Sequence, residues 1–159
     1  MAKEEKTNAM RILERAKLPY AAHTYPHGDG PVDGVTVAQS MGQDPARVFK
    51  TLVTRGASKE YRVFLVPVEK ELALKAAARA AKEKSVEMIH VSELNAVTGY
   101  IRGGCSPIGM KKRFFTVVDE SALAFDTIFF SAGRIGAQIE MSPRDLCMLV
   151  GAITAPIAE

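Results

Sequence analysis

The stretch Val48-Phe49-Lys50-Thr51-Leu52-Val53-Thr54 is followed, after Gly56-Ala57-Ser58, by a second apolar stretch, Tyr61-Arg62-Val63-Phe64-Leu65-Val66-Pro67-Val68. Both stretches are rich in β-branched and aromatic residues, and the connection between them is short and contains glycine. This arrangement is typical of a β-hairpin. We therefore predict strands over 48–54 and 61–68 that pair with each other.

Further strands and short helices are predicted on both sides of this hairpin. The predicted strands are 20–25, 86–89, 115–119, 127–131 and 137–141; the predicted helices are 7–16, 35–41, 72–81, 92–97 and 143–150, with a helical turn beginning at Asp44-Pro45. Strands and helices are interspersed, and several strands are joined by short loops. The pattern predicts an α+β fold with a mixed, largely antiparallel and partly closed sheet flanked by helices, rather than a regular parallel βαβ array.

Length and composition indicate one globular domain, residues 1–159, with 47% hydrophobic and 25% charged residues. No apolar run is long enough to span a bilayer, and the charged N-terminus, residues 1–6, predicts no secretory signal. The two cysteines fit a reducing, cytoplasmic environment. The net charge of +3 permits a polyanionic partner without requiring one.

A glycine-rich loop with a basic end is the first candidate binding element. It reads Gly103-Gly104-Cys105-Ser106-Pro107-Ile108-Gly109-Met110-Lys111-Lys112-Arg113. Glycines allow backbone N–H groups to face an anionic oxygen, and adjacent cations suit phosphate. The alternative is an ordinary tight turn beside a solvated charge cluster.

Lys50 is the second candidate, because it lies within an apolar strand. A buried ammonium is costly unless it meets an anion or a carbonyl group. The alternative is a lysine at a sheet edge, with its stem buried and its head in water.

The histidines and cysteines carry weaker signals. His23, His27 and His90 lack the spacing of a metal site, and no metal or cofactor is predicted. Cys105 could act as a nucleophile if loop amides and cations stabilised its thiolate, but a small, partly buried thiol without a chemical task is the simpler interpretation. Cys147 is expected in the core.

Four segments resemble the YbaK/EbsC family of free-standing trans-editing proteins, relatives of the editing domain of bacterial prolyl-tRNA synthetase. They are residues 23–27 (HTYPH), 44–52 (DPARVFKTL), 98–109 (TGYIRGGCSPIG) and, more weakly, 136–141 (GAQIEM). The resemblance extends from about residue 9 to residue 151. Within the family, the chain is similar to Cys-tRNA(Pro) deacylases.

The resemblance implies a barrel-like central sheet, a mischarged tRNA(Pro) as substrate, and prolyl-tRNA synthetase as a candidate partner. It also implies catalysis without a protein nucleophile, because the thiol of the cysteinyl group attacks its own ester. The implied catalytic residues are Lys50, Gly103 and Gly104; the implied substrate-binding residues are Tyr25, Ser106, Pro107, Gly109 and Gln138; and Lys111, Lys112 and Arg113 are implied to contact tRNA.

One departure from the family pattern concerns Gln138, which stands where the family commonly has aspartate. A neutral amide does not pair with the substrate's α-ammonium as a carboxylate does. Near it, Ala132-Gly133-Arg134-Ile135 has one cation fewer than the family's usual Gly-Gly-Lys-Arg. A deacylase for another amino acid, a non-catalytic module that binds a tRNA end or a nucleotide, and a thiol hydrolase using Cys105 therefore remain alternatives.

Overall fold

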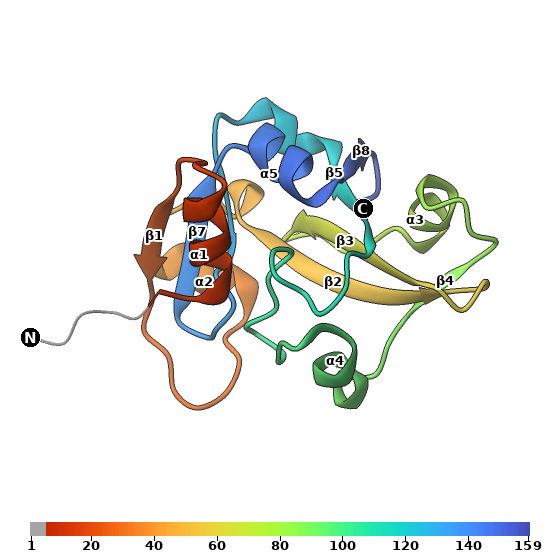
Figure 1. The fold of residues 1–159 in the computed structure, drawn as a ribbon, viewed down its shortest axis with the longest axis horizontal. Coiled ribbons are helices and arrows are strands. Elements are labelled where there is room, and N and C mark those ends of the chain that lie inside the picture. The colour runs from red at the N-terminus through yellow and green to blue at the C-terminus, as the bar shows by residue number, and fades with distance from the viewer. Residues whose placement is uncertain (1–5) are drawn as a thin grey trace, which may run out of the picture.

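We describe residues 6–159 of a computed structural model of the chain (Figure 1). The expectation about a secretory signal rests on residues 1–6 and so lies almost entirely outside the described part. The elements are α1 (Asn8–Arg15), β1 (Ala21–Thr24), α2 (Gly34–Ser40), η1 (Pro45–Arg47), β2 (Phe49–Gly56), β3 (Tyr61–Pro67), α3 (Leu74–Ala80), β4 (Val86–Met88), α4 (Val91–Thr98), β5 (Phe115–Asp119), η2 (Glu120–Ala124), β6 (Ile128–Ser131), β7 (Ala137–Met141), α5 (Pro143–Val150) and β8 (Ile153–Ala155).

The predicted hairpin is confirmed as β2 and β3, which pair antiparallel from Phe49 opposite Pro67 to Arg55 opposite Tyr61. They are the middle strands of a five-stranded sheet with the order β4-β2-β3-β5-β8. β5 runs parallel to both of its neighbours, β3 and β8, and β4 is antiparallel to β2. The α+β class and the mixed sheet are therefore confirmed.

The predicted partial closure of the sheet into a barrel is the part of the fold prediction that is wrong. β1, β7 and β6 form a separate antiparallel sheet. Among residues 6–159, one parallel bridge, between Val48 and Phe129, joins it to the larger sheet. A barrel needs strand pairing all the way around. Here the pairing between the two sheets ends after that bridge, so the strands remain in two sheets.

The two larger groups of buried apolar side chains hold the layers together. The larger core lies against α1 and α5 and includes Leu13, Phe130 and Leu146, none of which is exposed. The second core fills the space between the other face of the hairpin and α3, with Phe64 and Ala77 fully buried. In Figure 1, α3 and α4 accordingly lie on opposite sides of the β2–β3 hairpin.

Most predicted elements appear within a few residues of their expected bounds, and the differences have local causes. The helical turn at Asp44-Pro45 is only the three-residue 3₁₀ helix η1, because the chain returns to extended backbone at Val48 and enters the sheet. The third predicted helix begins at Leu74 rather than Leu72, since Leu72 pairs with Ala158 in a β-bridge. β8 was not predicted. Within residues 6–159, no helix is long and apolar enough to cross a membrane.

Candidate active site

A pocket of about 140 Å³ lies where the start of β2, the beginning of α2 and the glycine-rich loop meet. Four of the predicted site residues, which come from distant parts of the sequence, line it together: Tyr25, Lys50, Gly103 and Gln138. Its other walls are Val32, Gly34, Val37, Val48, Phe49, Thr51, Val68, Cys105 and Ser131. The pocket is therefore small, and both apolar and polar side chains form its wall.

The pairing of β1 with β7 sets the positions of Tyr25 and Gln138. His23 lies opposite Gln138 in this ladder, and Thr24 lies opposite Ala137. Directly after the ladder, the Tyr25 N–H donates to the Gly136 carbonyl at 3.0 Å. Tyr25 is 5% exposed and Gln138 is 6% exposed. Both side chains are thus held by backbone pairing rather than by a flexible loop.

Lys50 lies in β2 opposite Val66. Its side chain is 29% exposed, and its Nζ lies 3.8 Å from Glu71 Oε1. The Glu71 side chain is 83% exposed, so this ion pair is long and well solvated, and such pairs contribute little to stability. The ammonium is therefore half-buried at the pocket and is held only loosely by its carboxylate partner.

Gly103 lies beneath the segment that connects β1 to α2. Its φ of +86° is in the left-handed region, and a Cβ atom added to it would stand 2.7 Å from Pro31 Cβ. Glycine is required here for both reasons. Pro31 therefore lies directly over the part of the glycine-rich loop that lines the pocket.

Gly104, the second glycine predicted for the site, packs against another segment of the backbone. Its N–H donates to the Ile101 carbonyl at 3.0 Å, so this amide is already used within a turn. A Cβ atom on Gly104 would come within 3.0 Å of the Arg134 backbone. Gly104 is buried and does not line the pocket, so its place in the structure is one of close backbone packing.

Two buried oxygen atoms at this pocket have no hydrogen-bond partner among the described residues: Gln138 Oε1 and Thr51 Oγ1. Leaving such a group unpaired costs about 1–3 kcal/mol. Both residues line the pocket, so a ligand that offers a donor at this wall would remove that cost. Thr51 follows Lys50 directly in the sequence, yet its type alone gave no reason to single it out. The same holds for Ser131, which also lines the pocket.

Cys105 lines the same pocket and is 8% exposed. Burial raises the pKa of its thiol to about 12, although a hydrogen bond with Thr98 acts in the opposite direction. At neutral pH the group is therefore a protonated thiol, which is a poor nucleophile. This environment argues against the thiol hydrolase alternative.

The rest of the glycine-rich loop faces a second pocket of about 230 Å³, lined among others by Pro107, Gly109 and the basic residues 111–113. Ser106 is fully buried, and its Oγ accepts from the Ile108 N–H at 3.3 Å. None of Ser106, Pro107 and Gly109 lines the pocket that holds Lys50. The structure therefore divides the predicted site residues between two places.

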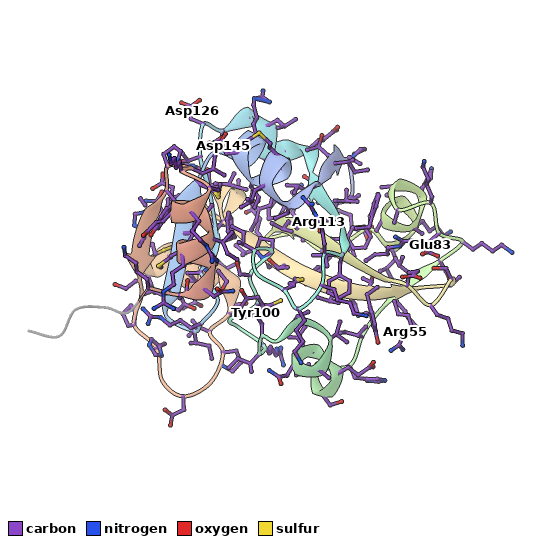
Figure 2. The ribbon with its side chains drawn as sticks, viewed as in Figure 1. Arg55, Glu83, Tyr100, Arg113, Asp126 and Asp145 are labelled. Carbon is purple, nitrogen blue, oxygen red and sulfur yellow. The ribbon has the colours of Figure 1, made fainter. Side chains whose placement is uncertain are left out.

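The three basic side chains at the end of the loop are all exposed. Arg113 lies beside α5 (Figure 2) and donates to the Leu149 and Val150 carbonyls at 3.0 and 3.4 Å. Lys111 Nζ donates to the Ala96 carbonyl at 3.3 Å. Arg113 thus satisfies carbonyl groups at the C-terminus of α5, and the side chain of Lys112 makes no hydrogen bond or ion pair within residues 6–159.

His23 and His27 take structural positions. His23 Nε2 lies 2.9 Å from Glu140 Oε1. Two hydrogen bonds lower the pKa of Glu140: that from Thr127 has the larger effect, and that from His23 the smaller one. The ring of His27 packs on Gly136, where a Cβ atom would stand 2.2 Å from its Cδ2. Within the described part of the chain, no group of three or more His, Cys, Asp or Glu side chains is arranged to hold a metal ion.

Known proteins are similar to this chain in sequence and in fold. The family model described as the aminoacyl-tRNA editing domain matches residues 32–149. A protein of Enterococcus faecalis, EbsC, which is named as a candidate Cys-tRNA(Pro)/Cys-tRNA(Cys) deacylase, is 44% identical over 154 residues, covering 97% of this chain and 94% of its own.

Two solved structures share the fold. One is a candidate trans-editing enzyme for prolyl-tRNA synthetase, with a TM-score of 0.81 at 23% identity, covering 98% of this chain and 99% of its own. The other is a hypothetical protein, with a TM-score of 0.83 at 24% identity, covering 94% of this chain and 97% of its own. The matched family model spans most of the chain, including the walls of the Lys50 pocket except Tyr25. This chain belongs to the aminoacyl-tRNA editing domain family.

Proposed function

We propose that this chain, acting as one domain, is a trans-editing deacylase that removes cysteine mistakenly attached to tRNA(Pro). The observation that carries the proposal is the gathering of Lys50, Tyr25, Gly103 and Gln138 around one small pocket. The 44% identity to EbsC, which is named for the same activity, supports this choice of substrate. The cytoplasm, where tRNA is charged, is the compartment in which such an enzyme works.

An aminoacyl ester is already activated, so the pocket needs to hold the carbonyl group and stabilise the oxyanion that develops on it. The half-buried ammonium of Lys50 provides a positive charge for this oxygen. Gly103, without a side chain, lets the ester approach the backbone closely. The apolar walls, such as Val37 and Val68, limit the size of the side chain that can enter.

The proposed reaction is assisted by the substrate. The cysteinyl sulfur attacks the carbonyl carbon of its own ester, a C–S bond forms, and the bond from the carbonyl carbon to the ribose oxygen breaks. The products are a cyclic thioester and free tRNA, whose ribose oxygen takes the proton that the thiol loses. No protein thiol takes part, which agrees with the high pKa of Cys105.

The tRNA itself requires contacts outside this small pocket. Lys111 and Lys112, both exposed at the end of the glycine-rich loop, suit phosphates of the acceptor end, which position an RNA without reading its sequence. Prolyl-tRNA synthetase is the proposed partner, because it produces the mischarged tRNA.

The test is deacylation of Cys-tRNA(Pro) and Ala-tRNA(Pro) by wild type and by Lys50→Ala, with Lys84→Ala, an exposed lysine outside the pocket, as the control. We expect rapid release of cysteine by wild type and by the control, slow release of alanine, and a loss of at least about 100-fold for Lys50→Ala. Background release by wild type on both substrates would refute the deacylase. Faster release of alanine than of cysteine would leave the deacylase in place and refute its substrate.

A non-catalytic module that binds a tRNA end is the second candidate. The neutral amide of Gln138 favours it, because it gives the substrate's α-ammonium no opposite charge. Saturable binding of tRNA without turnover on any mischarged species would establish this alternative.

A further inference from the structure

A second hollow adjoins the Lys50 pocket and shares part of its wall. It has a volume of about 390 Å³ and lies between β2, the end of β4 and the start of α4. Thr51, Gly103 and Cys105 line both spaces. The two are thus neighbouring compartments separated by the same three residues.

The proposed substrate is also built of two parts, joined at an ester. The amino acid is small, and the nucleoside that carries it is larger and has a flat base. The smaller compartment contains the predicted catalytic lysine, and the larger one has a volume within the usual range for small-molecule sites. An ester placed at the shared wall would therefore direct the amino acid into one compartment and the nucleoside into the other.

The larger compartment is lined by apolar side chains and by planar polar groups. Its floor includes Met88 and Val91, which are 47% and 59% exposed, and the partly buried Leu94. Exposed apolar side chains at a hollow are typical of a binding surface. His90 and Arg102, both exposed, add an imidazole ring and a guanidinium group, the planar groups on which bases stack.

The charges of the same region suit RNA. Arg102 is exposed and forms no ion pair with any other residue in the range 6–159, so its guanidinium is free to meet a phosphate. The carboxylate of Glu93, in α4, is already paired with Arg55 at 2.6 Å. Its other oxygen accepts from the His90 N–H at 3.3 Å. The negative charge of Glu93 is thus compensated by Arg55, whereas the positive charge of Arg102 is not compensated by any residue in the range 6–159.

The wall between the compartments provides a polar group where the ribose would lie. Thr51 Oγ1 is shielded from solvent and has no hydrogen-bond partner among the described residues. A ribose bears hydroxyl groups that both donate and accept. The unpaired hydroxyl therefore makes the shared wall more favourable for a ribose hydroxyl than for an aliphatic group.

We propose that the hollow formed by Met88, Val91, Leu94 and Arg102 binds the terminal nucleoside of the tRNA, with the ribose against Thr51. This inference rests on the proposed function, since it concerns the other half of the same substrate. It assigns base stacking and a phosphate contact to a surface that lies apart from the basic residues 111–113.

A binding experiment that does not depend on catalysis tests the proposal. Protein with ¹³C-labelled methionine methyl groups is titrated with the trinucleotide CCA, the 3′ end common to all tRNAs, and then with uncharged tRNA(Pro). We expect a saturable shift of the Met88 methyl signal with both probes. Met148, which is 67% exposed in α5, is the matched control and should not shift. A Met88 signal that stays unchanged with both probes would overturn the proposal.

Kinetics provide the second measurement. Arg102→Ala is expected to raise KM for the mischarged tRNA about 5- to 10-fold, the loss of one stacking or phosphate contact, with kcat within about twofold of wild type. Arg79→Ala, an exposed arginine in α3, is the control. An unchanged KM in Arg102→Ala would overturn the phosphate contact. A saturable Met88 shift in a protein without deacylase activity would support this binding site while refuting the proposed function.

Discussion

Pro31 lies against Gly103, so close that a Cβ atom on Gly103 would stand 2.7 Å from Pro31 Cβ and 2.9 Å from its Cα. The contact joins the segment between β1 and α2 to the glycine-rich loop at the edge of the Lys50 pocket. Val32 and Gly34, which follow Pro31, also line that pocket. The shape of the pocket therefore depends on two segments separated by about seventy residues fitting backbone against backbone.

Gly103→Ala is expected to lower kcat/KM for the mischarged tRNA by about 10- to 100-fold, because the added methyl group displaces Pro31 and strains a backbone with φ of +86°. Gly30→Ala, in the same segment, is the control, since a Cβ atom there meets nothing within 4 Å. Thermal unfolding measures the stability of both variants. Wild-type kinetics in Gly103→Ala would contradict the close packing described here.

Gln138→Asp is expected to strengthen binding of the aminoacyl group, because a carboxylate pairs with its α-ammonium more strongly than an amide does. KM should fall about fivefold, which corresponds to about 1 kcal/mol for a charge-assisted hydrogen bond. An α-amino group has a pKa of about 8, so the gain should be present at pH 6 and fade as the pH rises past 8.

Gln138→Asn is the matched control for that variant, since asparagine has the length of aspartate without its charge. It should show no pH-dependent gain. The KM of each variant is measured from pH 6 to pH 9. A gain in Gln138→Asp that does not change with pH would show that the effect comes from size and not from charge.

Cys105→Ala is expected to make the stability of the protein less sensitive to alkaline pH. The thiol has a pKa of about 12 in the folded state, well above its ordinary value of 9.0. Above pH 9 the unfolded state loses this proton and the folded state keeps it, so wild type loses stability as the pH rises from 9 toward 12. Tyr20 and Cys147, whose pKa values are also raised, remain in both proteins. Burial is the main cause of the raised pKa of Tyr100, so that group loses only the smaller contribution that Cys105 makes to its pKa.

Melting temperatures of wild type and Cys105→Ala between pH 8 and pH 10.5 measure this effect. The curve of wild type should fall more steeply. Deacylation at pH 7.5 should stay within about threefold of wild type, because a protonated thiol is not a nucleophile. A loss of activity comparable to that of Lys50→Ala, with the fold retained, would restore the thiol mechanism.

We expect the neighbouring basic residues to have different roles. Arg113→Ala should mainly lower stability, and Lys112→Ala should mainly weaken tRNA binding. Arg113 donates to two carbonyls at the C-terminus of α5, so its loss should lower the free energy of unfolding by about 1 kcal/mol. Lys112→Ala should leave stability within about 0.5 kcal/mol. Urea unfolding measures the stability, and the salt dependence of tRNA affinity measures the phosphate contacts. Equal stability of the two variants would contradict a capping role for Arg113.

The hairpin, the cap residues and most element bounds could be predicted from the sequence because they depend on neighbours a few residues away. Thr7, Asp44 and Ser142 each cap the helix that follows them, and Gly99 and Gly151 end helices in the left-handed conformation. Each of these features depends only on how a residue at the helix end satisfies the nearby backbone N–H or carbonyl groups. The family motifs likewise indicate four residues that line the Lys50 pocket: Tyr25, Lys50, Gly103 and Gln138.

Contacts between distant segments decided the rest. No local sequence pattern predicts the pairing of β1 with β7 or the bridge at Val48 between the two sheets. The same is true of the hydrogen bonds from Arg113 to the end of α5. The sequence by itself determined the elements, the residue types available for ester chemistry and the family. Only the tertiary structure decided that the Thr51 hydroxyl and the Gln138 carbonyl oxygen have no hydrogen-bond partner among residues 6–159, and that a second hollow adjoins their pocket. Burial and pairing depend on which surfaces meet in space, and that is fixed by packing of the whole chain.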